Sequence, residues 1–166
     1  MKKTPPGYDE AVGHLAVQRG SLDLPRTNWA ALLGEPHQSL DKAIGEKHLL
    51  NGIEGTDVDF EIYLIRDRLR LHTDLTLFPC MVTLGLILAC DEGACITTGR
   101  SNITVSPGDL YRLDPNKMHG AHGYEFLAFI SYDYRQGHEP EPAKFRHEAL
   151  RAFMVVARKR GAIARS

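Results

Sequence analysis

The chain has 166 residues, a length typical of one domain built around one main core. Apolar residues make up 43% of the chain and charged residues 25%, which is ordinary for a globular protein and excludes intrinsically disordered and collagen-like classes. The net charge of -1 excludes a general attraction to nucleic acid or acidic lipid, so any electrostatic partner requires a local patch of charge.

Cysteine use and hydropathy indicate where the protein acts. Cys80, Cys90 and Cys95 are an odd set without a close pair, and the N-terminus lacks the apolar stretch of a secretion signal, so we expect a cytoplasmic protein. The longest apolar run, residues 81–90, is too short to span a bilayer, so we expect no membrane anchor. Cys90 and Cys95 could be half of a zinc site, but buried or turn cysteines are favoured because matching ligands are absent elsewhere.

The first third, residues 1–55, is expected to be a helical segment that packs on the rest of the chain. Short helices are predicted over residues 8–18, over residues 29–33 with Thr27 and Asn28 as plausible N-caps, and from residue 39 toward residue 50. The turn residues Asn51-Gly52 then mark a change from helical to alternating periodicity.

The middle of the chain, residues 56–134, is expected to form a barrel. Val58, Phe60, Ile62 and Leu64 alternate with more polar residues, as in a strand with one buried face. Further strands are predicted at residues 69–74, 81–89, 94–98, 102–105, 110–113 and 124–132. Short strands at such regular spacing, without helices between them, indicate a barrel or a sandwich.

The C-terminal part, residues 142–160, is expected to form a basic amphipathic helix with Phe145, Leu150 and Phe153 in its apolar stripe. Residues 142–166 carry seven basic residues against one acidic residue, Glu148. We favour a helix that docks on the barrel and leaves its charges in solvent. Contact with the phosphate backbone of a nucleic acid is the less favoured alternative and stays open. Binding of this tail to the acidic remainder of the chain, in one subunit or between two, is a further option.

Three polar residues form a candidate metal site. His72 and Asp74 are two residues apart, so on one strand both side chains project from the same face and can bind one ion. His119 is the third candidate, and two imidazoles with one carboxylate leave the open positions that suit non-haem Fe(II) chemistry. His122 would face the other way on a regular strand. The alternative for His72 and Asp74 is an ordinary surface hydrogen bond.

These residues resemble the motifs of two families of double-stranded β-helix proteins. Residues 72–74, His-Thr-Asp, together with His119 resemble the His-x-Asp…His signature of Fe(II)- and 2-oxoglutarate-dependent dioxygenases. Gly108, Pro115 and His119 follow the outline of the second cupin motif, with the proline one residue late. The resemblance covers about half of the chain and implies a mainly β, cupin-like jelly-roll barrel, with short helices before it and a helix after it, that holds Fe(II) or another divalent metal.

The chain departs from the dioxygenases where they bind 2-oxoglutarate. The resemblance implies an arginine about ten residues after the distal histidine, and this chain has Phe129-Ile130-Ser131 there, which argues against 2-oxoglutarate. Arg70, expected on the strand face of His72, and Arg100, on a neighbouring turn, are the candidate replacements for cofactor binding. Lys117 is a third.

Two main functions and one minor one follow. The first is a mononuclear Fe(II) oxygenase-like enzyme that acts on a small molecule or a side chain, with Arg70 and Tyr111 as catalytic candidates and Phe129 in the wall that orients the substrate. Tyr111 and Asp114 are expected at the mouth of the site, and the alternative for Asp114 is a turn. The second is a non-catalytic cupin that binds a ligand or serves as a sensor or scaffold. The third is a barrel used only for oligomerisation, and a homodimer is compatible with all three.

Overall fold

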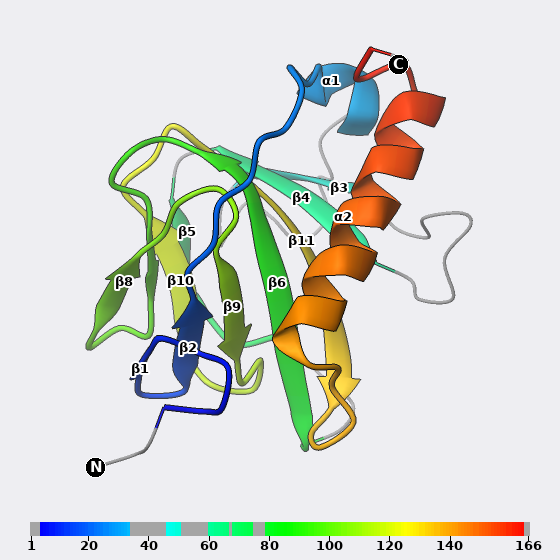
Figure 1. Ribbon diagram of the computed structural model, residues 1–166. Coiled ribbons are helices and arrows are strands. Elements are labelled where there is room, and N and C mark those ends of the chain that lie inside the picture. The colour runs from blue at the N-terminus through cyan, green and yellow to red at the C-terminus, as the bar shows by residue number, and fades with distance from the viewer. Residues whose placement is uncertain (1–3, 34–45, 51–59, 67, 75–78, 165–166) are drawn as a thin grey trace.

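The computed structural model describes residues 4–33, 46–50, 60–66, 68–74 and 79–164, which form two antiparallel sheets and two helices (Figure 1). The large sheet has seven strands, in the order β1 (Glu10–Val12), β2 (Leu15–Gln18), β9 (Leu110–Leu113), β6 (Met81–Cys90), β11 (Phe126–Arg135), β4 (Glu61–Arg66) and β3 (Glu46–Leu50). The small sheet has four strands, in the order β5 (Leu69–His72), β10 (His119–His122), β7 (Cys95–Thr97) and β8 (Asn102–Thr104).

Strands β4 to β11 form a jelly roll. The order β4-β11-β6-β9 in the large sheet lies opposite the order β5-β10-β7-β8 in the small sheet. This alternation of the chain between two four-stranded arrays is the topology of an eight-stranded jelly roll with two Greek keys. The mainly β barrel expected from the sequence is therefore confirmed by the strand order.

The position of strand β6 between two hydrophobic cores explains why its sequence is almost continuously apolar. Leu84, Leu86 and Leu88 point to the outer face of the large sheet, where they pack under helix α2 (Pro142–Lys159). Ile87 points to the inner face and joins the core between the two sheets. Both faces of the strand are buried, so neither set of alternating positions needs to be polar.

Helix α2 covers the outer face of the large sheet (Figure 1) and confirms the helix expected at residues 142–160. Phe145 and Phe153 are fully buried in this outer core. Two basic side chains hold the helix to the rest of the protein: Arg146 within it donates to the carbonyl of Gly108, and Arg160, which follows its last residue, donates to the carbonyl of Leu32 at 2.7 Å. Neither helix of the described residues is long and apolar enough to cross a membrane.

The N-terminal prediction is wrong for residues 8–18, which form the hairpin β1–β2 instead of a helix. Strand β2 pairs with β9 and so extends the large sheet. Because Leu15 and Val17 are buried in the inner core, the alternation within this short segment and its pairing with β9 outweigh helix propensity.

The other predicted N-terminal helices had mixed outcomes. The helix at residues 29–33 is confirmed as α1 (Trp29–Leu33), and Asn28 caps it by accepting a hydrogen bond from the backbone N–H of Ala31 at 3.1 Å. Of the helix expected over residues 39–50, the part at residues 46–50 is strand β3, so the prediction is wrong there. Residues 39–45 lie outside the described residues.

Candidate metal centre

His72, Asp74 and His119 come together on the inner wall of the barrel. Nε2 of His72 lies 3.3 Å from one carboxylate oxygen of Asp74, and Nε2 of His119 lies 3.4 Å from the other. One possible ligand atom from each of the three residues lies within 4.8 Å of the others. Ligand atoms that each lie about 2.1 Å from one ion are about 3.0–3.5 Å apart, so the two nitrogen–oxygen distances fit a shared metal.

The pairing of β5 with β10 brings the two histidines together. His119 is the register partner of His72, and their ring centroids are 4.5 Å apart. Ala121, two residues after His119, is paired with Leu69, three residues before His72, so β5 has one extra residue at this point. This bulge leaves Leu69 and His72 on the same, cavity-facing side.

The backbone of β5 approaches β10 closely at the bulge. A Cβ atom on Gly120 would lie 2.6 Å from the carbonyl oxygen of Leu69, which is shorter than any normal contact. Glycine at this position, directly after His119, therefore permits the bulge that sets the direction of His72.

The Nδ1 atom of each histidine is hydrogen-bonded to a backbone carbonyl, on the side of the ring away from Asp74. Nδ1 of His72 lies 2.6 Å from the carbonyl oxygen of Arg70, and Nδ1 of His119 lies 2.8 Å from that of Lys117. A carbonyl can only accept, so each Nδ1 carries the proton, and in a neutral ring Nε2 presents a lone pair to Asp74. Lone pairs that face a carboxylate require a cation between them, which is either a metal ion or protons on the two rings.

Asp74 is suited to serve as the anionic ligand. Burial alone would raise the pKa of its carboxyl group, but the hydrogen bonds and charges of His119 and His72 outweigh burial and lower the pKa well below its ordinary value. Its backbone N–H donates to the carbonyl of Pro115 at 2.8 Å, which fixes the chain just beyond β5. The carboxylate is therefore ionised at neutral pH and held in place.

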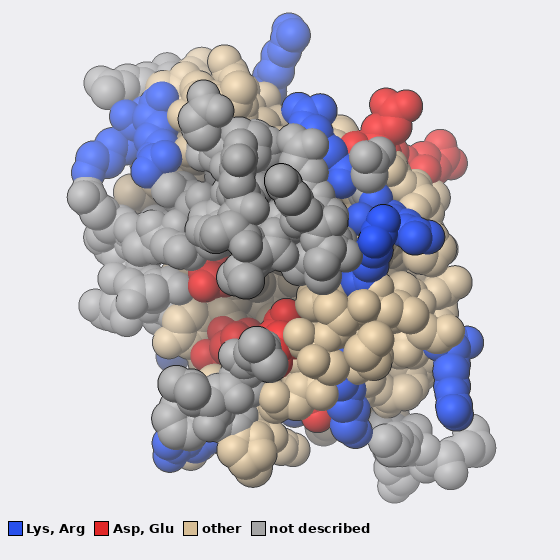
Figure 2. All heavy atoms as spheres, turned by 180° about the vertical axis from the view of Figure 1, so that it is seen from behind, with Lys and Arg blue, Asp and Glu red and all other residues tan. Residues whose placement is uncertain are grey.

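The three residues line a cavity of about 520 Å³ between the two sheets. Its apolar wall includes Ile87, Ile96, Leu113, Leu127 and Phe129. On the face of the molecule shown in Figure 2, acidic atoms are visible near the middle and at the upper right edge, and basic side chains lie at several places around them.

Tyr111 and Phe129 both line this cavity, as expected, and their rings meet edge to face at 6.0 Å. Tyr111 is buried rather than placed at the mouth, and its ring lies across β6 at Gly85, where a Cβ atom would come within 2.1 Å of the ring. Burial and the charges of nearby carboxylates raise the pKa of Tyr111, so its hydroxyl stays protonated at neutral pH.

The candidate basic residues lie elsewhere. Arg70 and Arg100 are exposed, and neither belongs to the described residues that line the cavity. The expectation that Arg70 shares the strand face of His72 is wrong, because the bulge in β5 shifts the alternation by one residue. His122 likewise does not line the cavity.

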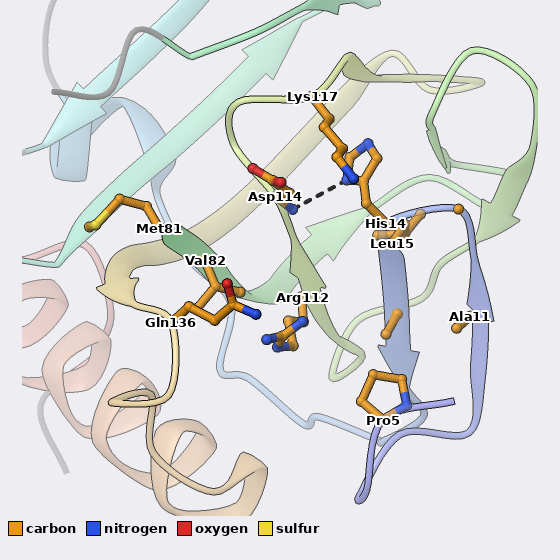
Figure 3. Close-up of a pocket in the computed structure, with 12 residues that line it drawn as sticks. Pro5, Ala11, His14, Leu15, Met81, Val82, Arg112, Asp114, Lys117 and Gln136 are labelled. Carbon is orange, nitrogen blue, oxygen red and sulfur yellow. Dashed lines mark hydrogen bonds between the residues drawn. The ribbon is translucent and has the colours of Figure 1, made fainter. Parts of the chain in front are cut away.

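Lys117 and Asp114 line a separate pocket of about 270 Å³ beside the N-terminal hairpin, where His14 lies between them and β2 (Figure 3). Asp114 accepts a hydrogen bond from the backbone N–H of Asn116 at 2.9 Å, as a turn residue does. Cys90 and Cys95 are free thiols, and the only cluster with metal-ligand geometry among the described residues is the one at Asp74.

The sequence analysis missed five polar residues of the cavity: Glu61, Tyr63, Thr83, Ser131 and Asp133. Asp133 was missed because β11 was expected to end at residue 132, and the strand continues to Arg135. Phe129, Ser131 and Asp133 are each two residues apart along β11, and this spacing alone predicts that their side chains share one face of the strand, which is the cavity side.

No family model matches the sequence, and no curated protein matches it. Among solved structures, the chain is similar to a cupin 2 conserved barrel domain protein from Rhodopseudomonas palustris, with 14% identity, a TM-score of 0.43, and coverage of 72% of this chain and 86% of that one. It is also similar to a cupin-like protein from Thermotoga maritima, with 15% identity, a TM-score of 0.41, and coverage of 69% and 95%. A cupin-2 domain protein from Shewanella frigidimarina has 16% identity, a TM-score of 0.40, and coverage of 53% and 79%.

These matched structures are cupin-2 and cupin-like proteins, and likenesses of this strength carry no functional argument. The strand order of the jelly roll is the observation that decides the fold. The barrel is an eight-stranded jelly roll, the architecture that cupins share with viral capsid and lectin domains. Within this barrel, a His-Asp-His group that could bind a metal lies on the wall of the central cavity.

Proposed function

We propose that the protein is a mononuclear non-haem metal enzyme that acts on a small molecule or a side chain, with Fe(II) held by His72, Asp74 and His119. The observation that carries the proposal is the approach of two imidazole Nε2 atoms to the two oxygens of one ionised carboxylate, at 3.3 and 3.4 Å. Two histidines and one carboxylate are the ligand set of non-haem Fe(II) oxygenases, and they leave positions open toward the cavity.

The chain's own residues would orient the substrate and exclude water. When bound, the metal would supply a site at which substrate and O2 meet. Phe129 and Leu127 present apolar surface to the cavity, and the protonated hydroxyl of Tyr111 is a hydrogen-bond donor within it. Tyr111 is therefore the better placed of the two catalytic candidates.

The composition of the cavity argues against 2-oxoglutarate as a cosubstrate. A dicarboxylate requires a cationic partner, usually an arginine that forms a bidentate pair. Among the described residues that line the cavity, none is Lys or Arg. The proposed chemistry is therefore one in which the substrate itself occupies the open positions of the metal.

A second candidate function is a non-catalytic cupin that binds a ligand as a sensor or scaffold. It is favoured by the fact that protons on His72 and His119 would also satisfy the Asp74 carboxylate, as two ion pairs without any metal. Thermal stabilisation by a small molecule but not by metal ions would support this function.

Cellular setting and assembly stay proposals. The three free cysteines are compatible with a reducing cytoplasm. A homodimer stays a prediction, as does contact with nucleic acid through the basic side chains of α2.

The test is metal analysis of protein purified without oxygen and incubated with Fe(II), Mn(II), Ni(II) or Zn(II). We expect one ion per chain in the wild type, and a loss of at least about 100-fold in affinity in Asp74→Ala and His119→Ala. Asp23→Ala, which removes an exposed carboxylate that does not line the cavity, is the matched control and should bind like the wild type. A wild-type protein that binds none of the four ions would refute the proposal.

A further inference from the structure

We propose that the cavity selects a protonated amine attached to an apolar body, with the ammonium group at Asp133 and Glu61 and the apolar body against the inner core. This inference rests on the proposed function, because it names the class of substrate that would lie beside the metal centre. It follows from the charges, hydrogen bonds and wall of the cavity.

Outside the His72–Asp74–His119 centre, the charged side chains of the cavity are acidic. Its described lining contains three carboxylates, those of Glu61, Asp74 and Asp133, and neither Lys nor Arg. A metal ion at the centre would be balanced in part by Asp74, and the other two carboxylates would remain. Figure 2 shows one group of acidic atoms near the middle of this face and a second group at its upper right edge. A cleft lined by charges of one sign raises the local concentration of ligands of the opposite sign.

The three carboxylates line the same cavity as the buried Tyr111 ring. Asp133, Asp74 and Glu61 all raise the pKa of the Tyr111 hydroxyl through their charges, after the larger effect of burial. The charge of Asp74 also raises the pKa of Asp133, after the larger effect of burial. Like charges so arranged repel each other, and a bound cation relieves the repulsion.

Asp133 has an oxygen available for a ligand. Its Oδ1 accepts a hydrogen bond from the hydroxyl of Thr83 at 2.6 Å, which fixes the carboxylate at the cavity. No described residue donates to its Oδ2. An ammonium group is the donor that suits such an oxygen, because charge-assisted hydrogen bonds are about twice as strong as neutral ones.

Glu61 is held in a similar way. It accepts a hydrogen bond from the hydroxyl of Tyr63, a neutral donor, so its charge is not compensated by this contact. Glu61 is the register partner of Ser131 on β11, two residues from Asp133, and all three residues line the cavity. Both carboxylates can therefore contact the same ammonium group.

The rest of the cavity is suited to hydrocarbon. Tyr63 stacks on Phe129 with ring centroids 5.0 Å apart, and Phe129 meets Tyr111 edge to face. Ile87 and Leu127 complete an apolar wall on the inner core. A cavity of about 520 Å³ is large enough for a drug-sized molecule, so an amine with an aromatic or branched aliphatic body fits.

The test is isothermal titration of the full chain with 2-phenylethylamine, and with 3-phenylpropanoate as an anion of similar size. Both probes are titrated into metal-free protein and into Fe(II)-loaded protein without oxygen. We expect the amine to bind at least about tenfold more tightly than the anion, and to bind more weakly as salt is added. Asp133→Asn keeps an oxygen for the Thr83 hydroxyl but removes the charge, so we expect about a tenfold loss of amine affinity with unchanged metal content.

Two further variants complete the test. Glu61→Gln should weaken amine binding in the same direction, and Asp23→Asn, the exposed control, should leave it unchanged. Equal affinity for amine and anion, an Asp133→Asn protein that binds the amine like the wild type, or an amine Kd weaker than about 10 mM would each overturn the inference. The metal-free titration separates the two ideas: a protein that binds no metal but still selects the amine refutes the metal enzyme and retains the amine site.

Discussion

The imidazole of His14 accepts a hydrogen bond at Nδ1 from the backbone N–H of Asp114, at 3.2 Å (Figure 3). Its other nitrogen, Nε2, donates to the carbonyl of Met118 at 2.9 Å. One ring from the β1–β2 hairpin thus spans the segment from Asp114 to Met118. This segment supplies the carbonyl of Pro115 that fixes Asp74 and the carbonyl of Lys117 that orients His119.

His14 is therefore expected to position the metal centre without touching it. In His14→Ala the segment loses both contacts, and we expect metal affinity to fall by about 10- to 100-fold, the usual effect of removing support behind a ligand. The measurement is competition with a chromogenic chelator. His138→Ala, at an exposed position, is the matched control. If His14→Ala binds metal like the wild type, the hairpin has no part in positioning the centre.

Substitution of Gly120 by alanine tests whether the bulge in β5 controls the position of His72. A methyl group in Gly120→Ala would meet the Leu69 carbonyl at 2.6 Å, so β5 must move away from β10 and carry His72 with it. We expect a loss of about 1–3 kcal/mol in the free energy of unfolding and weaker metal binding. Chemical denaturation and metal titration measure the two effects.

Gly137→Ala is the control for this variant, because nothing lies within 4 Å of its added Cβ. Its φ of 87° makes alanine strained, so we expect a cost of about 1 kcal/mol with metal binding intact. A Gly120→Ala protein that lost only stability would show that the bulge does not control the site.

The three candidate metal ligands could be predicted from the sequence, and their surroundings only in part. His72 and Asp74 stand at a spacing of two, and His119 lies on a strand that the jelly-roll order places beside β5. The bulge could not be predicted, because it depends on a close backbone approach at Gly120 that no local pattern reveals. For this reason Arg70 was placed on the wrong face of its strand.

The barrel strands were predictable because turn residues separate short alternating segments. The hairpin at residues 8–18 was not, since its strands are three and four residues long and gain their stability from pairing with β9, about 95 residues away in the chain. The local pattern of apolar and polar residues does not reveal a strand partner that lies so far away in the sequence.

Helix α2 offers a test of the outer core. Phe153 is fully buried and contacts Trp29 with ring centroids 5.7 Å apart, so Phe153→Ala should cost about 3–5 kcal/mol in the free energy of unfolding. Val155 lies on the same helix but is 43% exposed, and Val155→Ala should change stability by less than about 1 kcal/mol. Equal losses in the two variants, measured by urea denaturation, would contradict the packing of α2 on the large sheet.

The burial of Cys90 leads us to expect that the reactivity of its thiol depends on pH. Burial, with smaller contributions from the charges of Asp91 and Asp109, raises the pKa of Cys90 to about 11. The thiolate is the reactive form, so the rate of alkylation of Cys90 by iodoacetamide should rise about tenfold per pH unit between about pH 7 and pH 10. Cys80 is exposed and should be labelled faster than Cys90 at pH 8.

Peptide mass spectrometry after timed labelling measures both rates in the same sample. In the unfolded protein burial is lost, so Cys90 should react with the pH dependence of an ordinary thiol, which has a pKa of about 8.5. Labelling of Cys90 at pH 8 as fast in the folded protein as in urea would contradict its burial beside the carbonyl of Val105, which lies 3.8 Å from its sulfur. It would also contradict the contact between the end of β6 and Val105, the residue that follows β8.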